Sequence, residues 1–120
     1  MKSKKRVTKY LKKWTYLLGL RWWYIDLYWS EDHADFIRGD DTVLARTFAD
    51  WRYMKADVTF YIPALKDRTN EELESLVMHE LCHILVSEMR EDGIDHEERV
   101  VTTLQKAFSW TRYIEDSGLK

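Results

Sequence analysis

The segment His79-Glu-Leu-Cys-His83 constrains this chain more than any other feature, because it has the form His-Glu-x-x-His. Residues four apart lie on one face of an α-helix, so His79 and His83 can present two imidazoles to one metal ion. Glu80 follows the first histidine, where its carboxylate can reach a water molecule held by that metal. Two nitrogen ligands, an open coordination position and an adjacent carboxylate base are the parts of a hydrolytic zinc site.

The flanking residues predict that this segment lies inside a helix. Thr69 and Glu72 have the spacing of a capping box, which places the helix start near Asn70. Apolar residues then recur at helical spacing, and neither proline nor glycine interrupts the run before Gly93. The alternative is a pair of hydrogen-bonded core histidines, and the intervening Glu80 argues against it.

A third metal ligand is expected from a second helix that begins near His96, because a catalytic zinc site takes three protein ligands and a water. At about 100° per residue, Glu97 falls on the apolar stripe that packs this helix against the first one. A carboxylate on an apolar stripe needs a partner, and zinc is a suitable one. Glu97 is therefore the first choice. Glu98 and His96 are the alternatives, and both also suit an ordinary helix start.

The only cysteine, Cys82, lies between the two histidines. A single cysteine excludes an internal disulfide and is typical of a reducing compartment. A thiolate ligand is the alternative, but the face that Cys82 would use is already served by His83. Cys82 is therefore expected to be a small buried residue.

With these residues, the chain resembles small metallopeptidase-like proteins encoded by phages and prophages. The likeness covers mainly residues 70 to 110 and rests on the His79-to-His83 segment and the helix that follows it closely. Such proteins resemble short zincins of the gluzincin kind, in which a glutamate on the second helix completes the zinc site. The resemblance implies one Zn²⁺ per chain, with Glu80 as general base and His79, His83 and a glutamate near position 97 as ligands.

One departure and one rival accompany this resemblance. Larger gluzincins place an aspartate four residues after the ligand glutamate, where this chain has Val101. SprT-like proteases are the rival, because they complete the site with a later histidine. In that case His96 would be the third ligand.

The rest of the chain predicts an α+β fold made of one domain, residues 1–120. Residues 7 to 18 carry an apolar helical stripe that ends near Gly19. Residues 21–29, 45–53 and 56–63 have the composition and alternation of strands, the last two joined by a tight turn near Met54. Ser30 to Asp41 is polar and is expected to be a surface loop.

The expected architecture is an N-terminal helix, a small and mostly antiparallel sheet of about three strands, the helix with the two histidines, and the ligand helix. In the zincin fold that the resemblance implies, the strand ahead of the metal helix tends to lie at the sheet edge above the active site. Residues 56–62 are the candidates for that strand.

Residues 2–13 hold seven basic side chains and no acidic one. Because the formal net charge of the whole chain is −2, the remainder carries −9. Such asymmetry suits a nucleic acid or an acidic partner. We favour a solvent-exposed face of a packed helix, because the apolar stripe turns these residues away from the core, and nucleic acid is the weaker candidate.

The sequence thus predicts a zinc-dependent metallopeptidase that hydrolyses a peptide or protein substrate. One alternative is a catalytically inactive zinc-binding interaction module, and the other is a SprT-like protease acting on DNA-associated proteins. Glu80 argues against the first, because a structural site needs no base there. The chain carries neither a secretory signal nor an apolar run of about 18 residues, so we expect no membrane partner and a cytoplasmic location, in the host cell if phage-encoded.

Overall fold

An N-terminal helix, a small sheet and two further helices make up the described part of the chain in this computed structural model, residues 2–32, 37–38, 41–42, 44–87 and 97–116. The helices are α1 (Lys2–Leu17), α2 (Asn70–Leu85) and α3 (Glu97–Asp116), and a short 3₁₀ turn, η2 (Ile62–Ala64), precedes α2. The expected α+β class is confirmed at this level. None of the described helices is long and apolar enough to cross a membrane.

The main sheet has three strands, β1 (Tyr24–Ser30), β4 (Ala45–Asp50) and β5 (Lys55–Tyr61), in the order β1-β5-β4. β5 pairs in parallel with β1, which sets Trp29 opposite Phe60, and antiparallel with β4, which sets Thr47 opposite Val58. The sheet is therefore mixed, and the expectation of a mostly antiparallel sheet is wrong for one of its two pairings.

The expectation that residues 56–62 form an edge strand is also wrong. β5 lies in the centre, and its residues Ala56, Val58 and Phe60 are fully buried. The hairpin turn at Met54, which has a φ of 51°, places β4 on one side of β5. The remaining side of β5 pairs in parallel with β1. Among the described strands, β4 is therefore the edge strand that lies close to α2.

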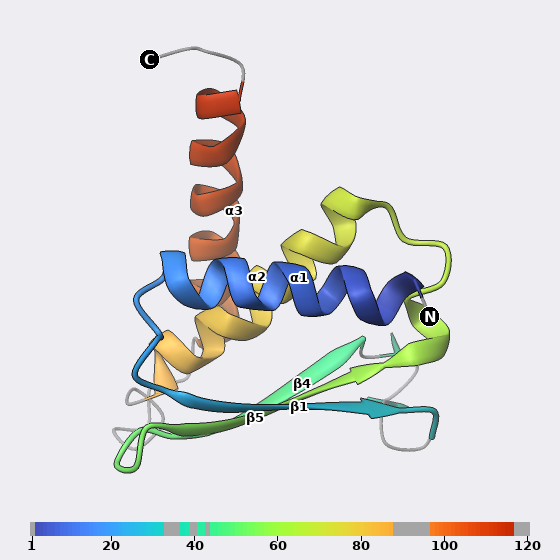
Figure 1. The fold of residues 1–120 in the computed structure, drawn as a ribbon, viewed down its shortest axis with the longest axis horizontal. Helices are drawn as coiled ribbons and strands as arrows, with labels where there is room; N and C mark the ends of the chain where they lie inside the picture. The colour runs from blue at the N-terminus through green and yellow to red at the C-terminus, as the bar shows by residue number, and fades with distance from the viewer. Residues whose placement is uncertain (1, 33–36, 39–40, 43, 88–96, 117–120) are drawn as a thin grey trace.

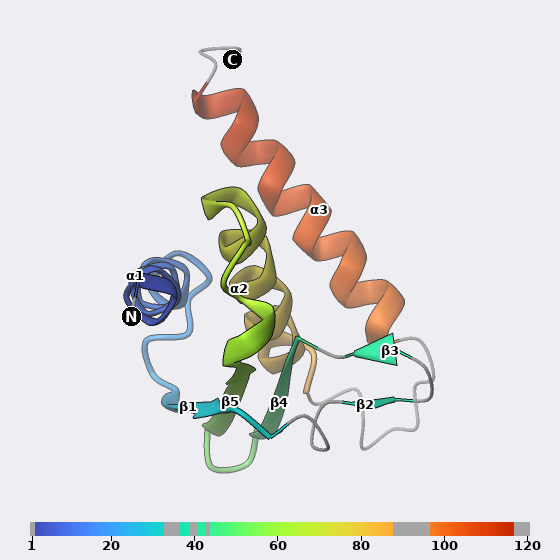
Figure 2. The same cartoon turned by 90° about the vertical axis from the view of Figure 1, so that its right-hand side faces the viewer.

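Helices α1 and α2 cover the same face of this sheet, with α1 over β1 and α2 over β5 and β4 (Figure 1, Figure 2). The expected stripe of α1 is confirmed at Val7, Leu11 and Trp14, which are buried, whereas Leu17 is 55% exposed. These side chains join Phe60 from β5 and further apolar residues of α2 in one core. Burying each large apolar side chain contributes roughly 1.5–3 kcal/mol.

The helix α2 begins where the capping box predicts. The hydroxyl of Thr69 accepts a hydrogen bond from the backbone N–H of Glu72 at 3.1 Å, and the Glu72 carboxylate accepts one from the Thr69 N–H at 3.1 Å. Farther along α2, the buried Glu74 carboxylate accepts hydrogen bonds from Trp14 Nε1 at 2.7 Å and from Lys13 Nζ at 2.9 Å. These contacts fix α2 against α1.

Within the expected surface loop, two short strands, β2 (Ile37–Arg38) and β3 (Asp41–Thr42), pair as an antiparallel sheet. Residues 33–36 and 39–40 of that loop lie outside the described residues. The helix α3 leans away from the body of the molecule, and its first turns lie beside α2 (Figure 2). Its Val101 is fully buried in a cluster with Cys82 and Val86.

Candidate metal centre

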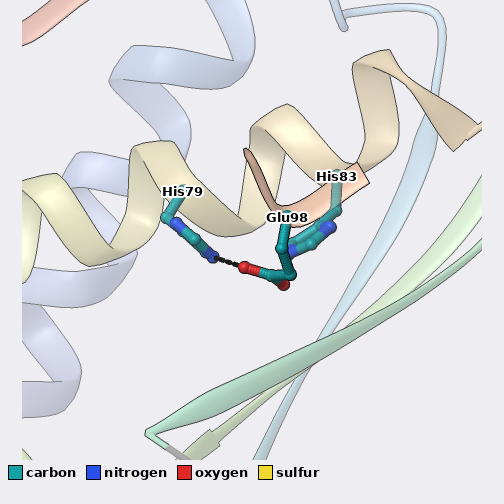
Figure 3. A group of neighbouring side chains, drawn as sticks. All are labelled: His79, His83 and Glu98. Carbon is teal, nitrogen blue, oxygen red and sulfur yellow. Dashed lines mark ion pairs between the residues drawn. The ribbon is translucent and has the colours of Figure 1, made fainter. Parts of the chain in front are cut away.

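His79 and His83 lie one turn apart on α2, with ring centroids 5.0 Å apart and rings near perpendicular. Their side chains are 21% and 10% exposed, so both are mostly enclosed but still reach solvent. The helical spacing that the sequence predicts therefore brings the two imidazoles together, and both turn toward the first turn of α3 (Figure 3).

The Nδ1 atom of each imidazole contacts an oxygen from α3. Nδ1 of His83 lies 2.6 Å from Oε2 of Glu97, and Nδ1 of His79 lies 2.8 Å from Oε1 of Gln105. The Gln105 amide in turn donates to the hydroxyl of Ser75 on α2. Because carboxylate and amide oxygens only accept hydrogen bonds, both imidazoles carry a proton on Nδ1. In its neutral form, each ring then presents an unprotonated Nε2.

Glu98 meets these two Nε2 atoms. Its Oε1 lies 2.9 Å from Nε2 of His83, and its Oε2 lies 3.3 Å from Nε2 of His79 (Figure 3). The candidate ligand atoms of His79, His83 and Glu98 all lie within 4.8 Å of one another. Lone pairs of neutral imidazoles would face a carboxylate here, and such acceptors repel unless a positive charge lies between them. A metal cation or an added proton supplies that charge.

This donor set fits zinc. Two imidazole nitrogens and one carboxylate are ligands that a catalytic zinc takes, and hydrogen bonds from the other ring nitrogens to an oxygen are typical of metal-binding histidines. The Glu98 side chain is 63% exposed, so the cluster opens to solvent on that side. The residues present therefore suit a three-ligand site that is accessible from outside.

Glu80 lies beside the cluster and is 4% exposed. Its Oε1 accepts a hydrogen bond of 2.8 Å from the hydroxyl of Thr47 on β4. Burial raises the pKa of the Glu80 carboxyl above its ordinary value, whereas the Thr47 hydrogen bond and then the charges of the two histidines act in the opposite direction. A carboxyl group with a raised pKa next to a metal site is suited to act as a general base.

The first choice for the third ligand, Glu97, lies where the helical stripe predicts, 14% exposed on the face that carries the buried Val101. Its carboxylate contacts the outer nitrogen of His83, while Glu98 takes the place beside the two Nε2 atoms. A carboxylate on an apolar face needs a polar partner, and for Glu97 this partner is the Nδ1–H group of His83. His96, the remaining alternative, lies outside the described residues.

Cys82 is fully buried, as expected, and it does not belong to the group of described residues that could hold a metal, His79, His83 and Glu98. Burial raises the pKa of this thiol to about 11, so it stays protonated at neutral pH.

Three residues of the site are absent from the sequence prediction: Thr47, Ser75 and Gln105. The sequence held a signal for two of them. Gln105 follows Glu98 by seven residues, which is close to two helical turns and therefore the same face of α3. Thr47 and Ala45 lie on the same, buried face of β4, and they alternate with the exposed residues Arg46 and Phe48. What it faces depends on strand order, which sequence alone does not give.

Comparison of the chain with protein-family models, with curated proteins and with solved structures finds no match.

Proposed function

We propose that this protein is a zinc-dependent metallopeptidase in which His79, His83 and Glu98 hold the metal and Glu80 is the general base. The observation that carries the proposal is the meeting of the Glu98 carboxylate with two Nε2 atoms whose rings are protonated on Nδ1. A zinc ion satisfies all three acceptors at once, whereas a proton satisfies only one contact at a time.

Zinc supplies Lewis acidity, which activates water and polarises a carbonyl group. The residues of the chain manage the protons. The Glu80 carboxylate accepts a proton from the water molecule while the oxygen of that water forms a bond to the peptide carbonyl carbon. Glu80 then gives that proton to the amide nitrogen as the carbon–nitrogen bond breaks. One water is consumed, and a carboxylic acid and an amine are formed.

Glu97 and Gln105 position the metal ligands. Each accepts a hydrogen bond from an Nδ1–H group, which fixes the tautomer and directs the Nε2 lone pair toward the site. The negative charge of Glu97 also makes the His83 ring a stronger donor toward a cation. Neither residue needs to touch substrate for this role.

The edge strand β4 supports a peptide as the substrate class. Among the described residues β4 pairs only with β5, so its other edge can receive an extended chain through backbone hydrogen bonds. Thr47 of this strand contacts the general base directly, which brings the strand to the reacting groups. A relationship to minimal zincins is part of this proposal, and the two histidines on α2 with Glu98 on α3 support it.

The test is cleavage of a mixed peptide library by the zinc-loaded chain, read by mass spectrometry, for the native sequence, Glu80→Gln and Glu71→Gln. Glu71 is an exposed acid in the first turn of α2 and serves as the matched control. We expect Glu80→Gln to bind zinc as the native chain does and to lose at least about 100-fold in turnover, the scale of general base catalysis. Turnover by Glu80→Gln at the native rate would refute the mechanism, and zinc binding without any native cleavage would favour an interaction module.

A further inference from the structure

A groove with a volume of about 580 Å³ lies along α1 beside Trp29 of β1. Its lining consists of Lys4, Lys5, Thr8, Lys9, Lys12 and Trp29. No acidic side chain appears in this lining among the described residues. Four lysines around one groove give it a positive potential, and a concave wall concentrates that potential on a bound ligand.

The lysines of the groove are available to a ligand. Two other basic residues of α1 have partners on α2: Lys13 forms an ion pair with Glu74, and Arg6 donates a hydrogen bond to the side chain of Asn70. Across the described residues, no ion pair involves any of the four groove lysines. Lys5, Lys9 and Lys12 are exposed and follow one another along about 10 Å of helix axis. They form a row of positive charges and not a single point.

Trp29 gives the groove an aromatic wall that is held in place. The ring packs on Phe60 of the core, with centroids 5.8 Å apart, and the Lys4 ammonium lies 5.6 Å from the ring centroid. The residue is only partly buried, so part of its surface faces the groove. An indole anchored on one side and open on another is suited to stack a planar group, and the adjacent cation favours an anionic one.

We propose that this groove binds single-stranded nucleic acid, with phosphates on the row of lysines and a base on Trp29. A row of cations beside a fixed aromatic ring is the combination that single strands use, because their bases are free to stack while the backbone follows the charge. In a duplex the bases are stacked inside the double helix, so a duplex would contact the lysines through its phosphates and would not stack on Trp29. The aromatic wall therefore decides between the two.

This site is independent of the metal centre. α1 and β1 lie on one side of α2, and the first turn of α3, which carries Glu98, lies on the other side (Figure 2). A nucleic-acid strand bound in the groove would therefore not cover the candidate metal centre at His79, His83 and Glu98. Failure of one proposal would therefore not decide the other.

The test is fluorescence anisotropy with labelled oligo-dT and oligo-U of 15 nucleotides, titrated with the full chain between 50 and 200 mM salt. With four phosphate contacts, we expect log K to fall with log salt with a slope of about −3, since each contact to a single strand adds about 0.7. The double variant Lys5→Ala/Lys9→Ala should lower the slope by about 1.4. The matched control, Lys55→Ala/Lys66→Ala, removes two exposed lysines outside the groove and should leave the slope unchanged.

A further variant, Trp29→Phe, keeps an aromatic contact with Phe60 while it shortens the stacking surface. We expect weaker binding with an unchanged salt slope, because no charge is lost. Binding of either oligonucleotide supports the proposal, and their ratio assigns DNA or RNA. Equal losses in the groove and control variants would overturn it. Absence of binding at 50 mM salt, or lysine-dependent binding only to phosphatidylglycerol vesicles, would overturn it as well.

Discussion

Nδ1 of His83 lies 2.6 Å from Oε2 of Glu97, so the glutamate that helical periodicity selects as a metal ligand forms a hydrogen bond with one of the two histidines. Glu98, the next residue, contacts the Nε2 atoms of His83 and His79. Two consecutive glutamates thus meet opposite nitrogens of the same imidazole. The proposed metal site depends on this division, because a ring protonated on Nδ1 is the form that offers Nε2 to a cation.

Gln105 should have a measurable effect on metal affinity although it lies two helical turns from Glu97. The Gln105→Leu variant removes the acceptor for Nδ1–H of His79 and frees that ring to rotate or change tautomer. We expect zinc affinity to fall about 10-fold or more in competition titrations with a chelating dye. Gln105→Glu keeps an acceptor and should retain near-native affinity. Equal affinities for the leucine variant and the native chain would contradict this role.

Thr47 holds the Glu80 carboxylate, and its removal should destabilise the metal-free chain at neutral pH. The Thr47→Val variant keeps the shape but leaves the buried acceptor without this donor, which costs about 1–3 kcal/mol. Urea unfolding at pH 7 in the presence of EDTA measures the change. Thr47→Ser retains the hydroxyl and should lose less. A valine variant as stable as the native chain would show that the hydrogen bond contributes nothing.

The raised pKa of Glu80 has a defined effect on stability as pH changes. Because its pKa is higher in the folded chain than in the unfolded chain, this group favours folding below the ordinary value of 4.5, and the contribution is lost as pH rises through the folded pKa. The unfolding free energy of the metal-free native chain, measured relative to Glu80→Gln, should therefore fall between pH 4 and pH 7.

Glu72 provides a control of opposite sign. Hydrogen bonds from the backbone and side chain of Thr69 lower its pKa, so its contribution is present above 4.5 and lost as pH falls. The native chain should gain stability relative to Glu72→Gln over the same rise in pH. The same direction of change for both variants would contradict the assigned pKa shifts.

Glu74 is predicted to contribute to the free energy of unfolding and not to zinc affinity. It is 1% exposed and accepts hydrogen bonds from Trp14 Nε1 and Lys13 Nζ. The Glu74→Ala variant leaves the indole N–H without this acceptor and opens a cavity between α1 and α2, so we expect a loss of about 2–4 kcal/mol in urea unfolding. Glu71→Ala, on the exposed side of α2, should change stability by less than about 0.5 kcal/mol. A similar small change for both would refute the role of Glu74.

Local signals account for the features that the sequence predicts correctly. The capping box at Thr69 fixes the start of α2, and the i, i+4 spacing fixes the shared direction of His79 and His83. The apolar stripe of α1 fixes which face of that helix is buried. Each of these depends on residues within a few turns of one another.

The strand order and the partners of the site residues depend on contacts between distant segments. Nothing in the sequence of β5 distinguishes a central strand from an edge strand, because both alternate apolar and polar residues. The choice between Glu97 and Glu98 depends on the exact crossing of α3 over α2. A rotation of α3 by about 100° exchanges their places. Thr47 reaches Glu80 only because β4 is the strand beside α2.

The most direct measurement of the central claim is zinc binding by competition titration and elemental analysis for the native chain, Glu98→Ala and Glu97→Ala. We expect about one zinc per native chain. Glu97→Ala should weaken zinc binding about 10- to 100-fold, because His83 loses the hydrogen-bond partner of its Nδ1–H group. Glu98→Ala should weaken zinc binding further, because it removes a proposed ligand. Native affinity in Glu98→Ala together with complete loss in Glu97→Ala would transfer the ligand role to Glu97. A native chain that takes up no zinc after reconstitution would contradict the metal site altogether.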